Sequence, residues 1–157
     1  MITRDDVKPI DELSEKARSN LDKLKTIVGA YQKRHSNGND HLRDTEAVMG
    51  LIGILKSHIK SATTFEDGGS ELHKELKNME KKAVINIGLP LTLDKLIPLT
   101  QKIRTLLQEE KTDDEVKLCN DVLSDTDKLK KIVSELQNNP RVKDEASSSA
   151  APRPGSR

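Results

Sequence analysis

The chain has 157 residues, of which 34% are charged, in near balance at a net charge of +1, and it contains one Tyr, one Phe, one Cys and no Trp. This composition excludes an internal disulfide, gives no overall attraction to nucleic acid or acidic lipid, and leaves few of the side chains from which active sites are built. The abundance of Leu, Ile and Val among charged residues is typical of amphipathic helices packed on one another.

The first helix is expected to begin near Thr3, a residue type that caps helix N-termini, with Pro9 in its first turn. Apolar residues then recur at steps of three and four along one face: Ile10, Leu13, Ala17, Leu21, Leu24, Val28 and Tyr31. This spacing predicts a single buried face. The last four residues also stand in near-heptad order, so packing within the chain and a helical oligomer are both open.

The second helix is predicted from about His41 to Ala62, with apolar residues around more than half of its circumference. These residues are Val48, Leu51, Ile52, Ile54, Leu55 and Ile59. We expect such a helix to be central in a bundle. Gly50 and Gly53 each lower its helix propensity by about 1 kcal/mol relative to Ala, so we expect them to admit a neighbouring helix at close approach. Residues 63–70 are predicted to form a loop.

Ser70 is expected to cap a third helix. Its apolar face carries Leu72, Leu76, Met79 and Ala83. The β-branched segment 84–90 resembles a short strand, but no partner strand is found, so we interpret it as a helix end and a buried connector. Thr92 is then expected to cap a short turn, and Pro98 to break or restart the fourth stretch. That stretch continues through Ile103, Leu106 and Leu107.

Thr112 and Glu115 have the spacing of a capping box, with Thr at the N-cap and Glu three residues later, directly before the fifth apolar period. That period comprises Val116, Cys119, Val122, Leu123, Leu129, Ile132, Val133 and Leu136. After Asn138 the chain offers no apolar face, which predicts a disordered tail. The predicted fold is therefore all-α, a compact bundle of about five helices in residues 1–137 followed by a tail at 138–157.

No pattern of catalytic, metal-binding or cofactor-binding residues is found. The four histidines, His35, His41, His58 and His73, do not have the spacing of converging zinc ligands, so we interpret them as surface residues. Cys119 lies on an apolar stripe, which favours a buried core residue over a nucleophile. Glycine-rich phosphate-binding motifs are absent from the sequence. We therefore expect no enzyme activity, no cofactor and no metal.

Two lysine clusters are interpreted as solvated helix faces. One comprises Lys74, Lys77, Lys81 and Lys82, and the other Lys128, Lys130 and Lys131. The interleaved aromatic residues that stack on bases are missing from both clusters, so nucleic-acid binding is not expected. The longest apolar run, Val48 to Leu55, contains two glycines and is too short to span a bilayer, so no membrane partner is expected either.

One part of the sequence resembles a known family. The segment Leu91-Thr92-Leu93-Asp94-Lys95-Leu96, the acidic start at 112–116 and a last helix with Lys130-Lys131-Ile132-Val133 are similar to the N-terminal helical domain of the elongation factor TFIIS, which the integrase-binding domain of LEDGF shares. The similarity covers about 71–136, and a second register over 48–99 follows nearly the same spacing. The resemblance implies a nuclear, transcription-associated docking module for short peptide motifs, without catalysis.

The predicted function is that of a non-enzymatic protein–protein interaction module, in which an apolar groove between helices receives a partner's helix or short motif. The candidate groove residues are Leu51, Ile54, Leu99 and Leu106, and plain burial in the core is the alternative for all four. The alternative function is a structural subunit of a helical homo- or hetero-oligomer. We expect an intracellular protein, nuclear or cytoplasmic, and the sequence leaves its oligomeric state open.

Overall fold

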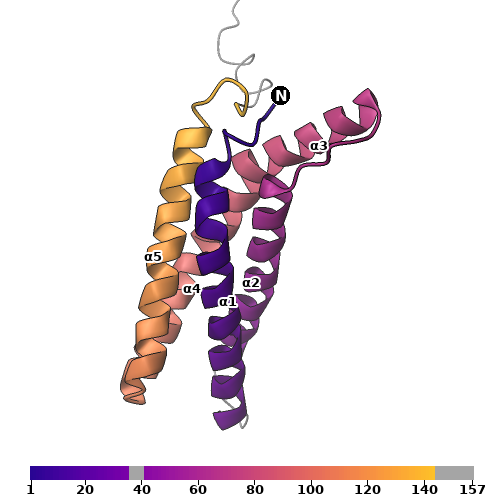
Figure 1. Ribbon diagram of the computed structural model, residues 1–157. Coiled ribbons are helices and arrows are strands. Elements are labelled where there is room, and N and C mark those ends of the chain that lie inside the picture. Colours follow the sequence, from indigo (N-terminus) through magenta and orange to yellow (C-terminus); the bar gives the residue numbers. More distant parts are fainter. Residues whose placement is uncertain (36–40, 144–157) are drawn as a thin grey trace, which may run out of the picture.

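The computed structural model describes residues 1–35 and 41–143, and within these ranges every regular element is a helix (Figure 1). This confirms the predicted all-α fold. The elements are α1 (Lys8–Arg34), α2 (Leu42–Thr63), α3 (Glu71–Ala83), the π-helical turn η1 (Val84–Gly88), α4 (Leu89–Glu109) and α5 (Asp113–Leu136).

Four of these helices form the bundle. Contacts run from α1 to α2, from α2 to α4, from α4 to α5 and from α5 back to α1, which closes a ring around one core. The third helix does not join this ring. It continues α4 beyond the end of the bundle through η1 and projects away from the other helices (Figure 1). The molecule is therefore a four-helix bundle with a helical extension, rather than five helices packed side by side.

The predicted stripe of α1 lies in the core. Leu21, Leu24, Val28 and Tyr31 are all at most 4% exposed. The near-heptad order of these residues therefore serves packing within the chain. Ile52, Leu55 and other apolar residues of α2 are fully buried as well. However, α2 is one of four helices in the ring and its Ile54 is exposed, so the predicted central position is not observed.

Segment 84–90 connects two helices, as predicted, but no helix ends in it. Residues 84–88 form a π turn that joins α3 to α4, so helical backbone runs without a break through 71–109. Thr92 caps no turn, because its hydroxyl donates a hydrogen bond to the Gly88 carbonyl 2.8 Å away inside the helix. Pro98 also lies inside α4 instead of ending it. The prediction of a break in this region is wrong.

Thr112 occupies the N-cap position of α5, as predicted, but the hydrogen bond of the predicted capping box is not formed. Its hydroxyl donates to the Leu107 carbonyl at 3.1 Å and accepts no hydrogen bond from the start of α5. A reciprocal capping pattern occurs instead at the N-terminus, where the Asp6 amide donates to the Thr3 hydroxyl at 3.2 Å and the Thr3 amide donates to the Asp6 carboxylate at 2.9 Å. This pattern fixes a turn, and α1 itself begins at Lys8. Ser70 does cap α3, accepting from the His73 amide at 3.1 Å.

The glycines of α2 do not admit a neighbouring helix. A Cβ atom added to Gly50 or Gly53 would meet nothing within 4 Å, so the predicted close approach at these positions is wrong. The close approach occurs at Gly88, where a Cβ atom would lie 3.0 Å from the imidazole ring of His58. His58 therefore packs on the π turn, and burial lowers its pKa.

Candidate functional site

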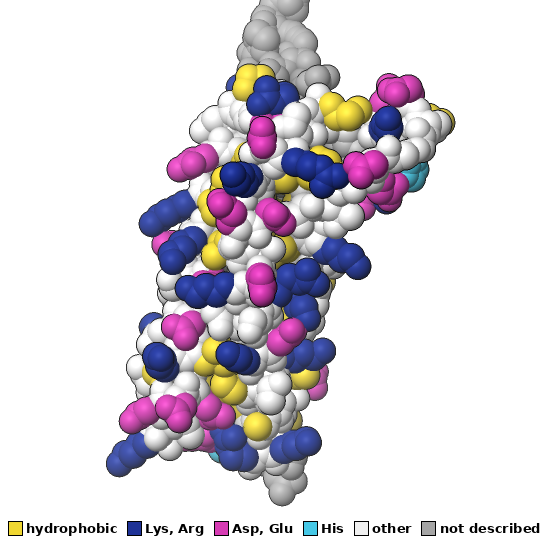
Figure 2. All heavy atoms as spheres, in the orientation of Figure 1, with side chains coloured by type: hydrophobic (Ala, Val, Ile, Leu, Met, Phe, Trp, Pro, Cys, Tyr) yellow, Lys and Arg dark blue, Asp and Glu magenta, His cyan; other side chains and the backbone are white. Residues whose placement is uncertain are grey.

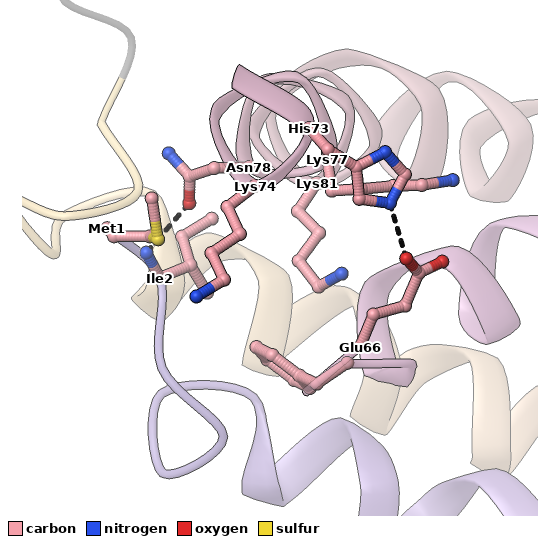
Figure 3. A pocket seen from close by; sticks show the side chains of 9 residues that line it. Met1, Ile2, Glu66, His73, Lys74, Lys77, Asn78 and Lys81 are labelled. Atoms are coloured by element: carbon pink, nitrogen blue, oxygen red, sulfur yellow. Dashed lines mark hydrogen bonds and ion pairs between the residues drawn. The ribbon is translucent and has the colours of Figure 1, made fainter. Parts of the chain in front are cut away.

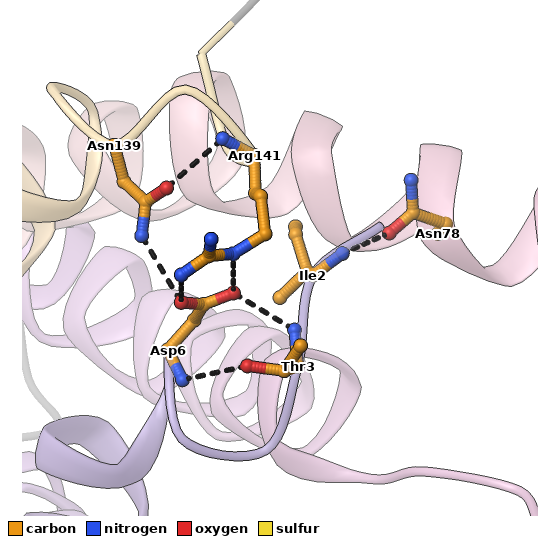
Figure 4. Close-up of polar contacts among 6 residues, drawn as sticks. All are labelled: Ile2, Thr3, Asp6, Asn78, Asn139 and Arg141. Atoms are coloured by element: carbon orange, nitrogen blue, oxygen red, sulfur yellow. Dashed lines mark hydrogen bonds and ion pairs between the residues drawn. The ribbon is translucent and has the colours of Figure 1, made fainter.

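The end of the bundle next to α3 is closed by contacts between the two ends of the described chain (Figure 4). The Arg141 guanidinium donates two hydrogen bonds to the Asp6 carboxylate, at 2.9 and 2.6 Å, and the Asn139 amide donates a third at 3.1 Å. The hydrogen bonds from Arg141 hold the pKa of Asp6 well below its usual range, against the opposing effect of burial. We call this arrangement the Asp6 clasp.

The packed region extends past the predicted boundary at residue 137. Val142 is fully buried, and its carbonyl accepts a hydrogen bond of 2.7 Å from the Asn86 side chain in η1. Residues 139–143 therefore belong to the bundle, where the prediction placed a disordered tail. The rest of that predicted tail, 144–157, lies outside the described residues.

The polar face of α3 is turned toward the bundle. Lys81 is only 6% exposed, its ammonium donates to the Thr64 carbonyl, and it lies 4.5 Å from the centre of the Phe65 ring. Burial lowers the pKa of Lys81. One helical turn away, the Asn78 side chain accepts a hydrogen bond of 2.8 Å from the Ile2 amide. These contacts attach α3 to the rest of the molecule by its polar side chains.

A small pocket of about 100 Å³ lies under this polar face (Figure 3). Its lining is Met1, Ile2, Phe65, Glu66, His73, Lys74, Lys77, Asn78 and Lys81. The His73 ring is paired with the Glu66 carboxylate at one side of the pocket. The Lys81 ammonium is held by Thr64 and Phe65. Lys74 and Lys77 lie 4.0 Å from Glu71 and 3.7 Å from Glu80, respectively.

The apolar face of α3 points away from the bundle. It continues across η1 into the first turn of α4, and its large members are between 53% and 65% exposed. We call the face the outer stripe, and it consists of Leu72, Leu76, Met79, Ala83, Ile87 and Leu91. Figure 2 shows hydrophobic side chains among charges of both signs at the projecting end, where Figure 1 places α3. An amphipathic helix normally buries its apolar face, so the orientation of α3 is the reverse of the usual one.

The π turn keeps the outer stripe straight. In an α-helix a step of four residues rotates about 40° past a full turn, so repeated steps of four would carry the stripe around the helix. The wider turn of η1 uses more residues per revolution, which offsets this drift where the stripe passes from Ala83 to Ile87 and Leu91. The stripe therefore stays on one side of the continuous helix from Leu72 to Leu91.

The four predicted groove residues occupy different environments. Leu106 is buried in the core, and Leu51 and Leu99 are half-buried against it. Only Ile54 is exposed, at 48%. Their helices, α2 and α4, are neighbours in the bundle, but three of the four side chains pack on the interior.

Two side chains of reactive type, Cys119 and His35, are engaged in packing or pairing within the protein. Burial raises the pKa of the Cys119 thiol to about 11, as expected for a core residue rather than a nucleophile. His35 pairs with Glu110 where α1 ends beside the end of α4. Among residues 1–35 and 41–143, no three His, Cys, Asp or Glu side chains come together as metal ligands would.

The continuous helix Glu71–Glu109 is long and apolar enough to cross a membrane, a property that core helices of bundles share. In this structure 39% of its most apolar 18-residue stretch is buried.

Comparisons with known proteins return no match. No family model matches the chain, and the searches of curated proteins and of solved structures find none either.

Sequence reasoning found the part of the outer stripe that lies on α3, but not its exposure to solvent. The step of four, three and four from Leu72 to Ala83 correctly placed these side chains on one face. The opposite face could have indicated this exposure. Viewed down the helix axis, Lys81 lies between Lys74 and Lys77, and polar contacts of these lysines could anchor that face to the bundle. The apolar continuation at Ile87 and Leu91 was hidden by the interpretation of 84–90 as a connector.

Proposed function

We propose that the protein is a non-enzymatic interaction module that docks a partner helix on the outer stripe of α3 and η1. The observation that carries this proposal is the reversed orientation of α3, whose polar face is anchored to the bundle while Leu72, Leu76 and Met79 face solvent. Large contiguous apolar surface is unfavourable on a monomer and marks interaction sites. The surface differs from the predicted groove on α2 and α4.

The shape of the surface favours a helical partner. Leu72, Leu76, Met79 and Ala83 follow the alternating steps of four and three with which two helices interlock side chains. Because α3 projects from the bundle, its outward face is accessible to an opposing helix (Figure 1). Acidic and basic residues alternate beside the stripe, which suits another protein helix better than a negatively charged lipid surface.

We also propose a role in transcription for this module. The similarity of 71–136 to the TFIIS N-terminal helical domain suggests an adaptor in transcription that acts in the nucleus. A stripe that recognises apolar side chains at helical spacing is compatible with such a role, because short disordered motifs of partners fold into helices on docking. A structural subunit of a helical oligomer uses the same surface, and the two roles differ only in what occupies it.

Capture experiments with paired variants test the proposed surface. Leu76 on the outer stripe and Ile54 on α2 are both exposed apolar residues, so Leu76→Asp and Ile54→Asp should both leave the fold intact by circular dichroism. Tagged wild-type chain and each variant are used to capture partners, identified by mass spectrometry. We expect Leu76→Asp to lose the specific partners and Ile54→Asp to retain them.

The matched pair gives each outcome a separate meaning. If Ile54→Asp loses the captured partners and Leu76→Asp retains them, the outer stripe is not the docking surface, and the groove predicted from the sequence is supported. Retention of all partners by both variants would contradict both surfaces. A Leu76→Asp chain that fails to fold would contradict the exposure of this residue, on which the proposal rests.

A further inference from the structure

We infer that the occupant of the outer stripe is a second copy of this chain, whose α3 packs against the first in antiparallel orientation. This inference rests on the proposed function and names its partner. It is carried by the order of apolar and charged residues along Glu71–Ala83 and by the orientation of that helix away from the bundle.

The apolar residues of α3 are self-complementary when the chain direction is reversed. Leu72, Leu76, Met79 and Ala83 are spaced four, three and four, an order that reads the same from either end. Two antiparallel copies therefore meet in four layers related by a two-fold axis. Leu76 faces the partner's Met79, and Leu72 faces the partner's Ala83. Such a closed two-fold contact uses the same patch on both copies.

The charges beside the stripe select the antiparallel orientation. Glu75 and Lys82 directly precede Leu76 and Ala83, which places both on the same side of the stripe. In antiparallel pairing these flanking positions face each other across the interface, so Glu75 of each copy lies opposite Lys82 of the other. In parallel pairing Glu75 would instead face Glu80, which places like charges together.

His73 and Glu80, on the opposite flank, make contacts within the chain. His73 pairs with Glu66, and Glu80 lies 3.7 Å from Lys77 and accepts from Ser61 at 3.3 Å. Glu75 and Lys82 are the residues whose charges distinguish the two orientations. Beyond the four layers, Ile87 and Leu91 continue the stripe toward the 64–70 loop of the other copy.

Residues 1–157 hold no apolar segment outside the described ranges that matches the stripe. The described residues leave it exposed, and the two remaining segments, 36–40 and 144–157, contain no Leu, Ile, Val, Met or Phe. These segments cannot provide an opposing apolar layer. The palindromic spacing of the stripe matches a second copy of this same helix.

Sedimentation of the purified full chain at about 1 to 200 µM tests for the second copy. We expect the mass to rise from monomer to dimer over this range, and Leu76→Asp to stay monomeric throughout because an unpaired charge would be buried in the interface. Ile54→Asp, outside the interface, should dimerise as the wild type does. Circular dichroism checks that each variant is folded.

Charge reversal tests the pairing of Glu75 with Lys82. Glu75→Lys and Lys82→Glu each place like charges together at two symmetric positions, so each should weaken the dimer by about three- to tenfold. The double variant restores opposite charges and should recover most of the loss. A double variant that is weaker than both single variants would overturn the antiparallel pairing.

Disulfide trapping distinguishes the two orientations directly. In the antiparallel dimer, residue 72 lies opposite residue 83 of the other copy, whereas the two residues 72 are about 16 Å apart, beyond the limit of about 7 Å between Cα atoms for a disulfide. A mixture of Leu72→Cys and Ala83→Cys chains should therefore form a mixed disulfide on mild oxidation. Leu72→Cys alone should form none, and its trapping would show a parallel dimer and overturn the inference.

A wild-type chain that stays monomeric at every concentration would also overturn the inference, whether or not it sediments with lipid vesicles. The proposed function is judged separately, by the capture experiment. A monomeric chain whose captured partners depend on Leu76 would keep the outer stripe as a docking surface for a different protein. A monomeric chain whose captured partners do not depend on Leu76 would contradict both the dimer and the docking function of the outer stripe.

Discussion

Helices α1 and α3 carry the same kind of apolar stripe and use it in opposite ways. In α1 the stripe is buried among α2 and α5, and in α3 it faces solvent while Lys81 and Asn78 hold the other face to the bundle. The difference follows from position. The long helix α1 lies between two neighbours, whereas the 13-residue helix α3 extends past the end of the bundle and meets few of its residues. Periodicity defines a face, and the position of the helix in the fold decides what that face contacts.

Matched leucines provide the strongest contrast between these two helices. Leu24 of α1 is fully buried and Leu76 of α3 is 54% exposed. Leu24→Ala should lower the free energy of unfolding by about 3 kcal/mol, because it leaves a cavity in the core. Leu76→Ala should change it by less than about 0.5 kcal/mol. Urea denaturation of both variants, at concentrations where the chain is monomeric, measures the difference. Equal losses would contradict the account.

Truncation sharpens the comparison between the packed chain end and the sequence beyond it. A chain ending at Asn138 lacks the fully buried Val142 and the Arg141 partner of Asp6, and it should be less stable by about 3 kcal/mol. A chain ending at Lys143 keeps these contacts and should melt as the full chain does. Calorimetry of the two truncated chains makes this test, and equal melting temperatures would show that residues 139–143 do not pack.

The Asp6 clasp makes part of the stability dependent on pH. The native pKa of Asp6 is depressed, so its contribution is fully present above about pH 4, the unfolded value, and is lost as the pH falls below that. Asp6→Asn should cost about 2 kcal/mol at pH 7. The difference between wild type and variant should narrow toward pH 3 in urea denaturation. Asp5→Asn, at an exposed neighbour, should show neither effect.

Two glycines should respond differently to alanine. Gly53 faces open space in mid-helix, so Gly53→Ala should stabilise the protein by about 1 kcal/mol. Gly88→Ala should not bring this gain, because its Cβ atom would press on the His58 ring. In a His58→Ala background the gain at Gly88 should return, which a double-mutant cycle measures. The same gain at Gly88 with and without His58 would contradict the packing of His58 on η1.

The sequence allowed the fold class and most core residues to be predicted, because a stripe such as Leu21 to Tyr31 reports directly which residues share a face. It did not reveal what lies opposite a given position. Gly50 and Gly53 suggested a close helix contact, yet the contact occurs at Gly88. Thr112 had the spacing of a cap, but its hydroxyl bonds backward to Leu107. The clasp depends on Asp6 and Arg141, which are 135 residues apart, and no local pattern connects them.

The central claim is that α3 presents its apolar face outward and its lysine face inward. Thiol labelling of Leu76→Cys and Lys81→Cys tests it most directly, at concentrations low enough to keep the chain monomeric. Cys119 is fully buried and serves as an internal unreactive control. We predict that Leu76→Cys reacts nearly as fast as in the unfolded chain and that Lys81→Cys is strongly protected. Rapid labelling at position 81 with protection at position 76 would contradict this orientation and the docking surface that depends on it.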